Sequence, residues 1–336
     1  MIVLIPAYKP DQRLIQLAQD LRALGDFQLV IVNDGSGPAY EPIFDQMRAL
    51  GAQVLVHDVN KGKGRALKTG FAYAMTQQNC GGVVTADADG QHLPKDIAAV
   101  AKRLSRCDDN TFVLGSRGFD ETTPLRSRLG NCITRSVFLW ASGNRVCDTQ
   151  TGLRGFPEAM LPWLTKIGGD RYEYEMDVLL AGARAGYQVQ QVLIDTVYFD
   201  ENKGSHFSTV RDAARVYRVI GRYTRGAIAA SAAELILFCV LCSVFAGKIA
   251  SAFWWVTVCF ALSRLLALLV KYALIRQKPV RYERTILAVR TVVSWGLLLA
   301  LMAGMRLPAF WAKLISSLVP FVLTLWALNA AAKKYE

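Results

Sequence analysis

Four long apolar segments near the C-terminus limit what this chain can fold into more than any other feature. From Ala227 onward the sequence is mostly Leu, Val, Ala, Phe and Trp, whereas residues 1–226 alternate short apolar runs with charged, glycine-containing connections. Each apolar segment is close to the ~20 residues that a helix needs to cross ~30 Å of hydrocarbon. The sequence therefore predicts membrane-spanning helices at about 227–247, 249–270, 285–305 and 307–329.

Basic residues between these segments indicate their orientation, because basic connections stay on the cytoplasmic side. The first and third connections hold one basic residue each, Lys248 and Arg306. The second connection and the tail hold Lys271, Arg276, Lys278, Arg281, Arg284, Lys333 and Lys334. The start, MIVLIPAYKP, lacks the basic region and the long apolar stretch of a signal peptide. We expect a multi-pass protein of the inner (plasma) membrane, with residues 1–226 and both termini in the cytoplasm.

The net charge of +12 fits a membrane surface better than nucleic acid. Residues 1–226 contain no run of Lys and Arg interleaved with aromatic residues, which nucleic-acid binding favours. Residues 208–223 instead combine apolar residues at helical spacing with a stripe of arginines: Val210, Ala213, Ala214, Tyr217 and Ile220, with Arg211, Arg215, Arg218 and Arg222. This pattern predicts an amphipathic helix in the membrane interface; the alternative is an ordinary helix with a solvated Arg face.

The chain has seven cysteines, and those in the first part of the chain lack the spacing of metal ligands. This pattern fits a reducing compartment. Cys239 and Cys242 form a CxxC pair, but inside an apolar segment without a second pair. We therefore expect these two cysteines to serve packing.

The first half of the chain reads as repeated strand–helix units. Short apolar runs predict strands at 2–5, 27–32, 53–57, 82–86 and 112–114. Apolar residues at helical spacing predict helices at 11–24, 65–75 and 94–104. Alternation of this kind predicts an α/β fold with a mainly parallel, Rossmann-like sheet and helices on both faces.

Polar residues follow three of the predicted strands, at 33–36, 87–91 and 116–117. Ligands bind beyond the carboxyl ends of the strands in such sheets. Asp87 and Asp89 share one side of an extended backbone, and Gln91 adds a neutral oxygen. Oxygen ligands suit Mg²⁺ or Mn²⁺, so the pattern indicates a divalent-cation site; the alternative is an ordinary turn.

Several motifs occur in one order along the first half of the chain: IPAYKP, VNDGS, NKGKGRALKTGF, DADGQH, GSR, DTQTGLRGF and KGSHFSTVRDAARVYR. Together they resemble the family-2 inverting glycosyltransferases with the GT-A fold, in particular the branch of dolichol-phosphate mannosyltransferases and bacterial polyprenyl-phosphate glucosyltransferases. The C-terminal helices resemble a GtrA-like membrane domain. The resemblance implies a GT-A domain at 1–202, a juxtamembrane segment at 203–226 and a GtrA-like domain at 227–336, whose helices could join copies into a homo-oligomer.

The resemblance also implies roles for the residues that match the family. Asp87, Asp89 and Gln91 would hold Mg²⁺ or Mn²⁺ on the donor diphosphate, and Asp89, Gln91 and Arg117 would be catalytic. Contacts to the nucleotide-sugar would come from Pro6, Ala7, Tyr8, Asp34, Lys63, Asp87, Ala88, Asp89, Asp148 and Gln150. The phosphate of the lipid acceptor would contact Arg117, Arg128, Ser205 and His206. Asn33 stands where the family usually has Asp, which weakens the expected base contact.

The resemblance implies transfer of a sugar from GDP-mannose or a UDP-hexose to dolichyl or undecaprenyl phosphate. Particular residues bear on three alternatives to this function: a polysaccharide synthase, a flipping protein and a sensing protein. A processive polysaccharide synthase would carry an Arg-Trp pair, which this sequence lacks. Intramembrane Glu234, Arg264 and Arg290 leave open a protein that flips lipid-linked sugar or senses nucleotide-sugar without transfer. Glu173 is interpreted as helix N-terminal charge, and Glu175 is left open between that role and a general base.

Overall fold

The computed structural model describes residues 1–77, 80–118, 131, 134–135, 138, 146–195, 211–245, 251–274 and 283–332. The chain divides into two compact units, Met1–Ile220 and Gly221–Glu336. This boundary falls inside the segment 203–226 that the sequence predicts as a juxtamembrane connection. Each unit is described by itself.

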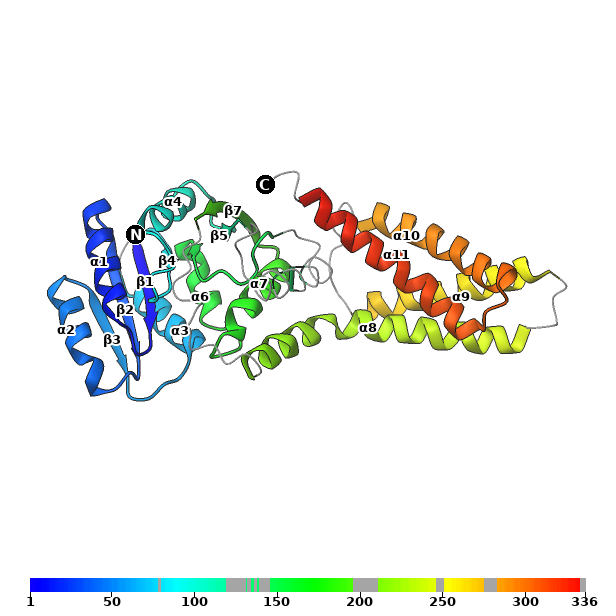
Figure 1. The fold of residues 1–336 in the computed structure, drawn as a ribbon, viewed down its shortest axis with the longest axis horizontal. Helices are drawn as coiled ribbons and strands as arrows, with labels where there is room; N and C mark the ends of the chain where they lie inside the picture. Colours follow the sequence, from blue (N-terminus) through cyan, green and yellow to red (C-terminus); the bar gives the residue numbers. More distant parts are fainter. Residues whose placement is uncertain are drawn as a thin grey trace. The chain divides into compact units, whose positions relative to one another are not determined.

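The first unit is built on one seven-stranded sheet with the order β3-β2-β1-β4-β6-β5-β7 (Figure 1). Its strands are β1 Ile2–Ala7, β2 Gln28–Asp34, β3 Gln53–His57, β4 Val83–Thr85, β5 Thr111–Arg117, β6 Arg154–Phe156 and β7 Gln188–Ile194. All described pairings are parallel except those of β6, which runs antiparallel to both β4 and β5. The predicted mainly parallel sheet is confirmed. The sequence did not predict β6 or β7, because β6 has only three residues and the three glutamines of β7 interrupt its apolar run.

Helices cover both faces of this sheet (Figure 1). Val3 and Ile5 of β1 belong to a core shared with α1, α2 and α4, whereas Leu4 points to the other face and contacts Gly70 of α3. A Cβ on Gly70 would lie 2.1 Å from Leu4 Cδ1, so a glycine is needed for α3 to pack this closely. The helices of this unit are α1 Gln12–Leu24, α2 Glu41–Ala49, α3 Lys63–Ala74, α4 Pro94–Leu104, α6 Leu161–Leu164 and α7 Glu173–Ala185.

Long helices make up the second unit. They are α8 Arg211–Phe245, which begins in the first unit, α9 Ala252–Leu274, α10 Glu283–Leu299, its π-helical continuation Ala300–Gly304, and α11 Ala309–Ala332. Three described helices are long and apolar enough to cross a membrane, within 211–245, 253–270 and 287–304. The structure describes the side chains of α11 over Ala309–Thr324, and this apolar part is shorter than the three candidate spans.

The predicted interfacial helix and the predicted first crossing form one continuous helix, α8. No proline interrupts residues 211–245, so nothing in the local sequence forces a break at residue 226. Cys242 packs with Phe238 and Cys259 in the core of the second unit, as expected for a cysteine that serves packing.

Candidate active site

The carboxyl ends of β1, β2 and β4 lie side by side at one edge of the sheet. Parallel pairing of β1 with β2 places Ala7 opposite Asn33, and β4 pairs with the other side of β1. Parallel strands that are neighbours end at the same edge, so the residues that follow them are brought together. The predicted site residues at this edge are Pro6, Ala7, Tyr8, Asp34, Asp87, Ala88 and Asp89.

Asp34, at the end of β2, holds the loop that leads into α3. Its Oδ1 accepts the Lys61 N–H at 2.9 Å and its Oδ2 accepts the Gly62 N–H at 2.8 Å. His57 Nδ1 lies 2.7 Å from the same Oδ1. Asp34 is buried, and both of its oxygens accept hydrogen bonds from backbone N–H groups of the loop, so this side chain fixes the conformation of the loop.

Lys63, the first residue of α3, lies between two carboxylates from distant parts of the sequence. Its Nζ lies 2.7 Å from Asp87 Oδ1 and 3.0 Å from Glu175 Oε1. Burial acts to lower the pKa of Lys63, but the charges of Asp87 and Glu175 outweigh it and raise that pKa. Lys63 is therefore a permanent positive charge that joins the end of β4 to α7.

A glycine allows the Asp87 carboxylate to occupy this position. A Cβ on Gly152 would lie 2.4 Å from Asp87 Oδ2, closer than any real carbon would approach. Thr85 fixes this contact from the β4 side, because its hydroxyl donates to the Gly152 carbonyl at 2.8 Å. The DTQTG segment and the end of β4 therefore pack as one piece.

The two aspartates of the DADGQH motif have opposite electrostatics. Burial by itself raises the pKa of Asp87, but the positive charges of Lys63 and Arg117, together with His92, lower it to about 2. Burial and the neighbouring Asp87 charge raise the pKa of Asp89. Neighbouring positive charges thus stabilise the ionised form of Asp87, whereas the surroundings of Asp89 disfavour its ionised form.

His92 supports this motif from inside the protein. Its Nδ1 accepts the Asp87 N–H at 3.0 Å, so a neutral ring carries its proton on Nε2. Burial lowers the pKa of His92, which favours that neutral form. Gln91 contributes its own N–H, which donates to Asp89 Oδ1 at 3.0 Å.

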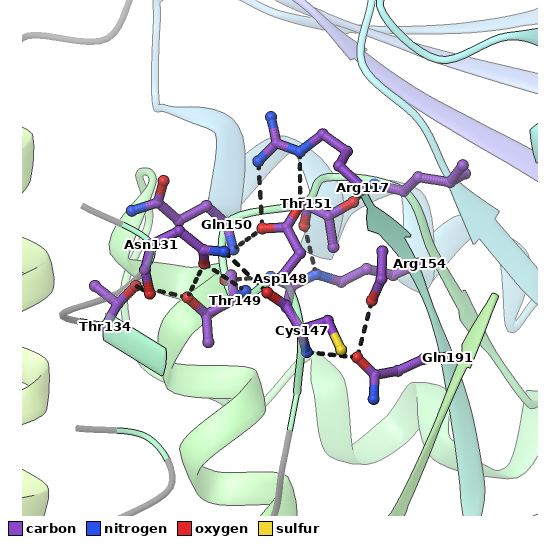
Figure 2. A network of polar contacts seen from close by, with 12 residues as sticks. Arg117, Asn131, Thr134, Cys147, Asp148, Thr149, Gln150, Thr151, Arg154 and Gln191 are labelled. Carbon is purple, nitrogen blue, oxygen red and sulfur yellow. Dashed lines mark hydrogen bonds and ion pairs between the residues drawn. The ribbon is translucent and has the colours of Figure 1, made fainter. Parts of the chain in front are cut away.

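Arg117, at the end of β5, is paired with Asp148 of the DTQTG segment (Figure 2). Arg117 Nε lies 2.6 Å from Asp148 Oδ2, and Nη2 lies 3.2 Å from Oδ1. Asp148 is completely buried and also accepts the Gln150 N–H at 2.9 Å, whereas Gln150 itself is exposed. Asp148 therefore fixes Arg117 beside Asp87, where its charge lowers the pKa of that carboxyl.

A network behind this pair keeps the DTQTG segment in place (Figure 2). Asn131 Oδ1 accepts the Thr149 N–H at 3.1 Å, and the Asn131 amide donates to the Cys147 carbonyl at 2.9 Å. Buried Arg154 donates from Nε to the Thr151 carbonyl at 2.9 Å and from Nη1 to the Glu175 carbonyl at 2.7 Å. Arg154 thus ties the segment to the helix that presents Glu175.

Sequence reasoning missed the connecting role of Arg154 and left Glu175 open. Their partners are backbone carbonyls and a lysine far away in the sequence, so no local pattern signals them. Glu173 has the helix-terminal position predicted for it: its Oε1 accepts the Asp170 and Arg171 N–H groups at the start of α7. Arg128, Ser205 and His206 lie outside the described residues.

The carboxylates at the end of β4 are chemically suited to a divalent cation. Asp87 and Asp89 offer oxygen ligands, and burial together with the Asp87 charge raises the pKa of Asp89, which a bound cation would counteract. In the part of the chain that the structure describes, no group of three or more His, Cys, Asp or Glu residues is placed to hold a metal alone. A cation bound here would need further oxygens, from Gln91, water or a ligand.

Comparison with known proteins identifies the class to which this fold and site belong. The profile of "Glycosyl transferase family 2" matches residues 2–161. An uncharacterized protein of Methanocaldococcus jannaschii is 30% identical over 216 residues, which cover 62% of this chain and 87% of that protein. The chain is a glycosyltransferase with a GT-A fold. It belongs to glycosyl transferase family 2.

Further relatives are similar over the same unit. The UDP-N-acetylglucosamine–dolichyl-phosphate N-acetylglucosaminyltransferase of Methanococcus voltae is 28% identical over 215 residues, covering 58% of this chain and 85% of that protein. A crystal structure of glucosyl-3-phosphoglycerate synthase from Mycobacterium tuberculosis with phosphoglyceric acid has a TM-score of 0.50 at 17% identity, covering 67% of this chain and 78% of that one. The likeness to this structure concerns the fold.

Proposed function

We propose that this glycosyltransferase moves a sugar from a nucleotide-sugar, GDP-mannose or a UDP-hexose, to a polyprenyl phosphate such as dolichyl or undecaprenyl phosphate. The observation that carries the proposal is the meeting of Asp87 and Asp89 with two cations, Lys63 and Arg117, at the carboxyl edge of a family-2 sheet. The Methanococcus voltae relative, which is named for transfer to dolichyl phosphate, supports the acceptor class. Apolar helices long enough to cross a membrane support a lipid acceptor.

In the proposed site, Asp87, Asp89 and Gln91 hold Mg²⁺ or Mn²⁺. When bound, the ion supplies positive charge that stabilises the departing diphosphate. The fit rests on the donor set described above, since Asp87 and Asp89 supply carboxylate oxygens and Gly152 leaves room for the Asp87 carboxylate. Lys63 then has the role of holding Asp87 in place and adding charge near the donor.

The transfer is a direct displacement. An oxygen of the acceptor phosphate forms a bond to the anomeric carbon of the sugar, and the bond between that carbon and the donor's diphosphate oxygen breaks. The nucleoside diphosphate departs with the bonding electrons, and the configuration at the anomeric carbon inverts. A phosphate is anionic near neutral pH, so no proton has to be removed and no general base is required.

Arg117 is placed to bind a phosphate group. Its side chain is partly exposed while the buried Asp148 fixes its orientation, so a guanidinium edge can face a phosphate. We assign Arg117 to the acceptor phosphate, with Arg128, Ser205 and His206 as further contacts. We assign Pro6, Ala7, Tyr8, Asp34 and Ala88, at the same edge, to the nucleotide side. Asp34 also holds the loop before α3.

We base the proposed membrane placement on the apolar segments and on the basic connections between them. The helices of the second unit cross the inner (plasma) membrane, and both termini with the transferase unit lie in the cytoplasm, because the basic connections favour that side. A transferase held at the membrane surface meets the phosphate of its lipid acceptor at head-group level. The same helices offer a surface through which copies could associate.

Transfer from radiolabelled UDP- and GDP-sugars to a polyprenyl phosphate tests the proposal with the full chain in detergent, with and without Mg²⁺ or Mn²⁺. We expect metal-dependent transfer, and Asp89→Asn should reduce it at least about 100-fold, as for loss of a group that stabilises charge in the transition state. Asp109→Asn removes an exposed carboxylate from a surface turn and is the matched control.

Three outcomes would contradict parts of the proposal. Full metal-dependent transfer by Asp89→Asn would show that the cation binds elsewhere. Saturable binding of a nucleotide-sugar without any transfer would favour sensing, and movement of a lipid-linked sugar across vesicles without transfer would favour flipping.

A further inference from the structure

Four charged side chains meet inside the helical unit, remote in sequence from the transferase motifs. Glu234 of α8 pairs with Arg264 of α9, with 2.9 Å between Oε2 and Nη1. It also pairs with Lys313 of α11, with 2.6 Å between Oε1 and Nζ. Arg264 also donates from Nη2 to the hydroxyl of Thr291 at 3.3 Å, which brings α10 beside this pair at the residue that follows Arg290. Each of the four long helices therefore contributes one member, and these four charged residues are called the helix-bundle cluster.

Glu234 and Arg264 lie deep along their helices, whereas Lys313 is about 6 Å from the start of α11 at Ala309. At about 1.5 Å per residue, Glu234 is roughly 16 Å from the end of α8 at Phe245, and Arg264 is roughly 18 Å from the start of α9 at Ala252. About half of the ~30 Å hydrocarbon thickness separates these residues from either surface if the helices span it. Ionisable residues at such depth are costly and mark functional sites.

The charges of the cluster do not cancel. Three cations face one carboxylate, which leaves the four residues with a net charge of +2. Arg264 and Lys313 share Glu234, and Arg290 has no ion pair among the residues that the structure describes. Both Glu234 oxygens are already engaged by Arg264 and Lys313. A cluster that served packing alone would be expected to balance its charge, because an uncompensated buried charge is strongly unfavourable.

Two donors of the cluster also lack acceptors. The Nε atoms of Arg264 and Arg290 are shielded from solvent and have no hydrogen-bond partner among the described residues. The remaining recorded contacts are a 3.3 Å hydrogen bond from Arg264 Nη2 to Thr291 and the position of the Arg290 guanidinium over Phe321. Unsatisfied guanidinium donors with surplus positive charge are the recognition chemistry of a phosphate group.

We infer that the helix-bundle cluster is a binding site for a phosphate group, a monoester or diester, within the helical unit. Arg290 and Arg264 donate to the phosphate, and Glu234 keeps Arg264 and Lys313 oriented when the phosphate is absent. The apolar surroundings, including Phe260 at 4.2 Å from Lys313 Nζ to ring centroid, strengthen each charge interaction. This inference rests on the membrane placement proposed above but not on the transfer reaction.

Counting bound ligands by native mass spectrometry tests the site in the full chain. The probe is farnesyl phosphate, with farnesol as the uncharged counterpart and inorganic phosphate as competitor. We expect two farnesyl phosphates per wild-type chain, one in each unit, and no comparable binding of farnesol. Arg290→Gln should retain one, or bind the second roughly tenfold or more weakly, because a charged hydrogen bond is lost. Arg290→Lys keeps the charge but not the guanidinium, so it should bind the second ligand more tightly than Arg290→Gln and more weakly than the wild type.

Arg306→Gln, which removes an exposed arginine after α10, is the matched control and should bind two. Arg117→Gln reports on the transferase unit: if it binds two while Arg290→Gln binds one, the proposed acceptor contact fails and the helix-bundle site stands. Competition by inorganic phosphate would show that the site accepts free phosphate, and lack of competition would assign it to lipid head groups.

A second variant protects the test against misfolding of Arg290→Gln. Glu234→Gln removes the carboxylate that occupies the cations, so farnesyl phosphate should raise the melting temperature of this variant more than that of the wild type. The inference is overturned if Arg290→Gln binds farnesyl phosphate with wild-type stoichiometry and affinity, or if farnesol binds as well as farnesyl phosphate.

Discussion

Replacement of Lys63 by Met tests the electrostatic account of the site most directly. The change keeps much of the side-chain volume but removes the charge that lies 2.7 Å from Asp87 Oδ1 and 3.0 Å from Glu175 Oε1. Both carboxylates then remain largely buried without this partner. We expect the transferase unit to lose stability at neutral pH and the pKa of Asp87 to rise.

The magnitude follows from the pKa of Asp87. The protein lowers this pKa from 3.8 to about 2, and Lys63 is the largest of the groups that lower it. At about 1.4 kcal/mol for each tenfold change in the acid constant, this difference corresponds to about 2 kcal/mol. A depressed pKa stabilises the folded state above the unfolded value, so the contribution is present above about pH 4 and is lost as the pH falls towards 2.

Urea unfolding of the full chain in detergent, followed by near-ultraviolet circular dichroism, measures the effect. Lys63→Met should unfold with about 2 kcal/mol less free energy than the wild type at pH 7, and the difference should shrink below about pH 4. Lys61→Met changes an exposed lysine of the same loop and should leave stability unchanged. Equal stability of Lys63→Met and wild type at pH 7 would refute the reasoning.

Two more predictions concern the DTQTG segment. Gly152→Ala should push the Asp87 carboxylate out of position, since the added Cβ would lie 2.4 Å from Oδ2, and transfer should fall about 100-fold in a radiolabel assay. Gly118→Ala, whose Cβ has its nearest neighbour at 3.9 Å, should stay fully active, and equal activity of the two variants would contradict this packing argument. Asp148→Asn should leave Arg117 without its buried carboxylate and cost about 2–4 kcal/mol in urea unfolding; a loss below about 0.5 kcal/mol would show that the pair contributes little.

Local patterns predicted much of the first unit. Apolar runs and helical spacing predicted the elements observed as β1, α1, β2, β3, α3, β4, α4 and β5, with ends that differ by a few residues. These signals depend on residues that are close in sequence, such as Asp11, which caps α1 by accepting the Arg13 N–H. The composition change at Ala227 likewise predicted the long apolar helices, because the length needed to cross a bilayer is a local property.

Long-range contacts were beyond this reasoning. The antiparallel β6 depends on pairing with β4 and β5, and its three residues carry no strand signal of their own. Lys63 and Glu175 are separated by more than a hundred positions, so no local motif indicates that Glu175 pairs with Lys63. The nucleotide contact of Asp34 stays a prediction, and the structure adds that the oxygens of Asp34 hold the loop before α3.

The sequence by itself determined the alternation of strands and helices, the carboxylates at the end of β4 and the apolar character of the last third, since each of these is written in neighbouring residues. Only the tertiary structure decided which cation meets which carboxylate: Lys63 with Asp87, Arg117 with Asp148, Glu234 with Arg264 and Lys313. The physical reason is that electrostatic pairing acts over a few ångströms of space, and folding brings together charges whose separation along the chain carries no information about that distance.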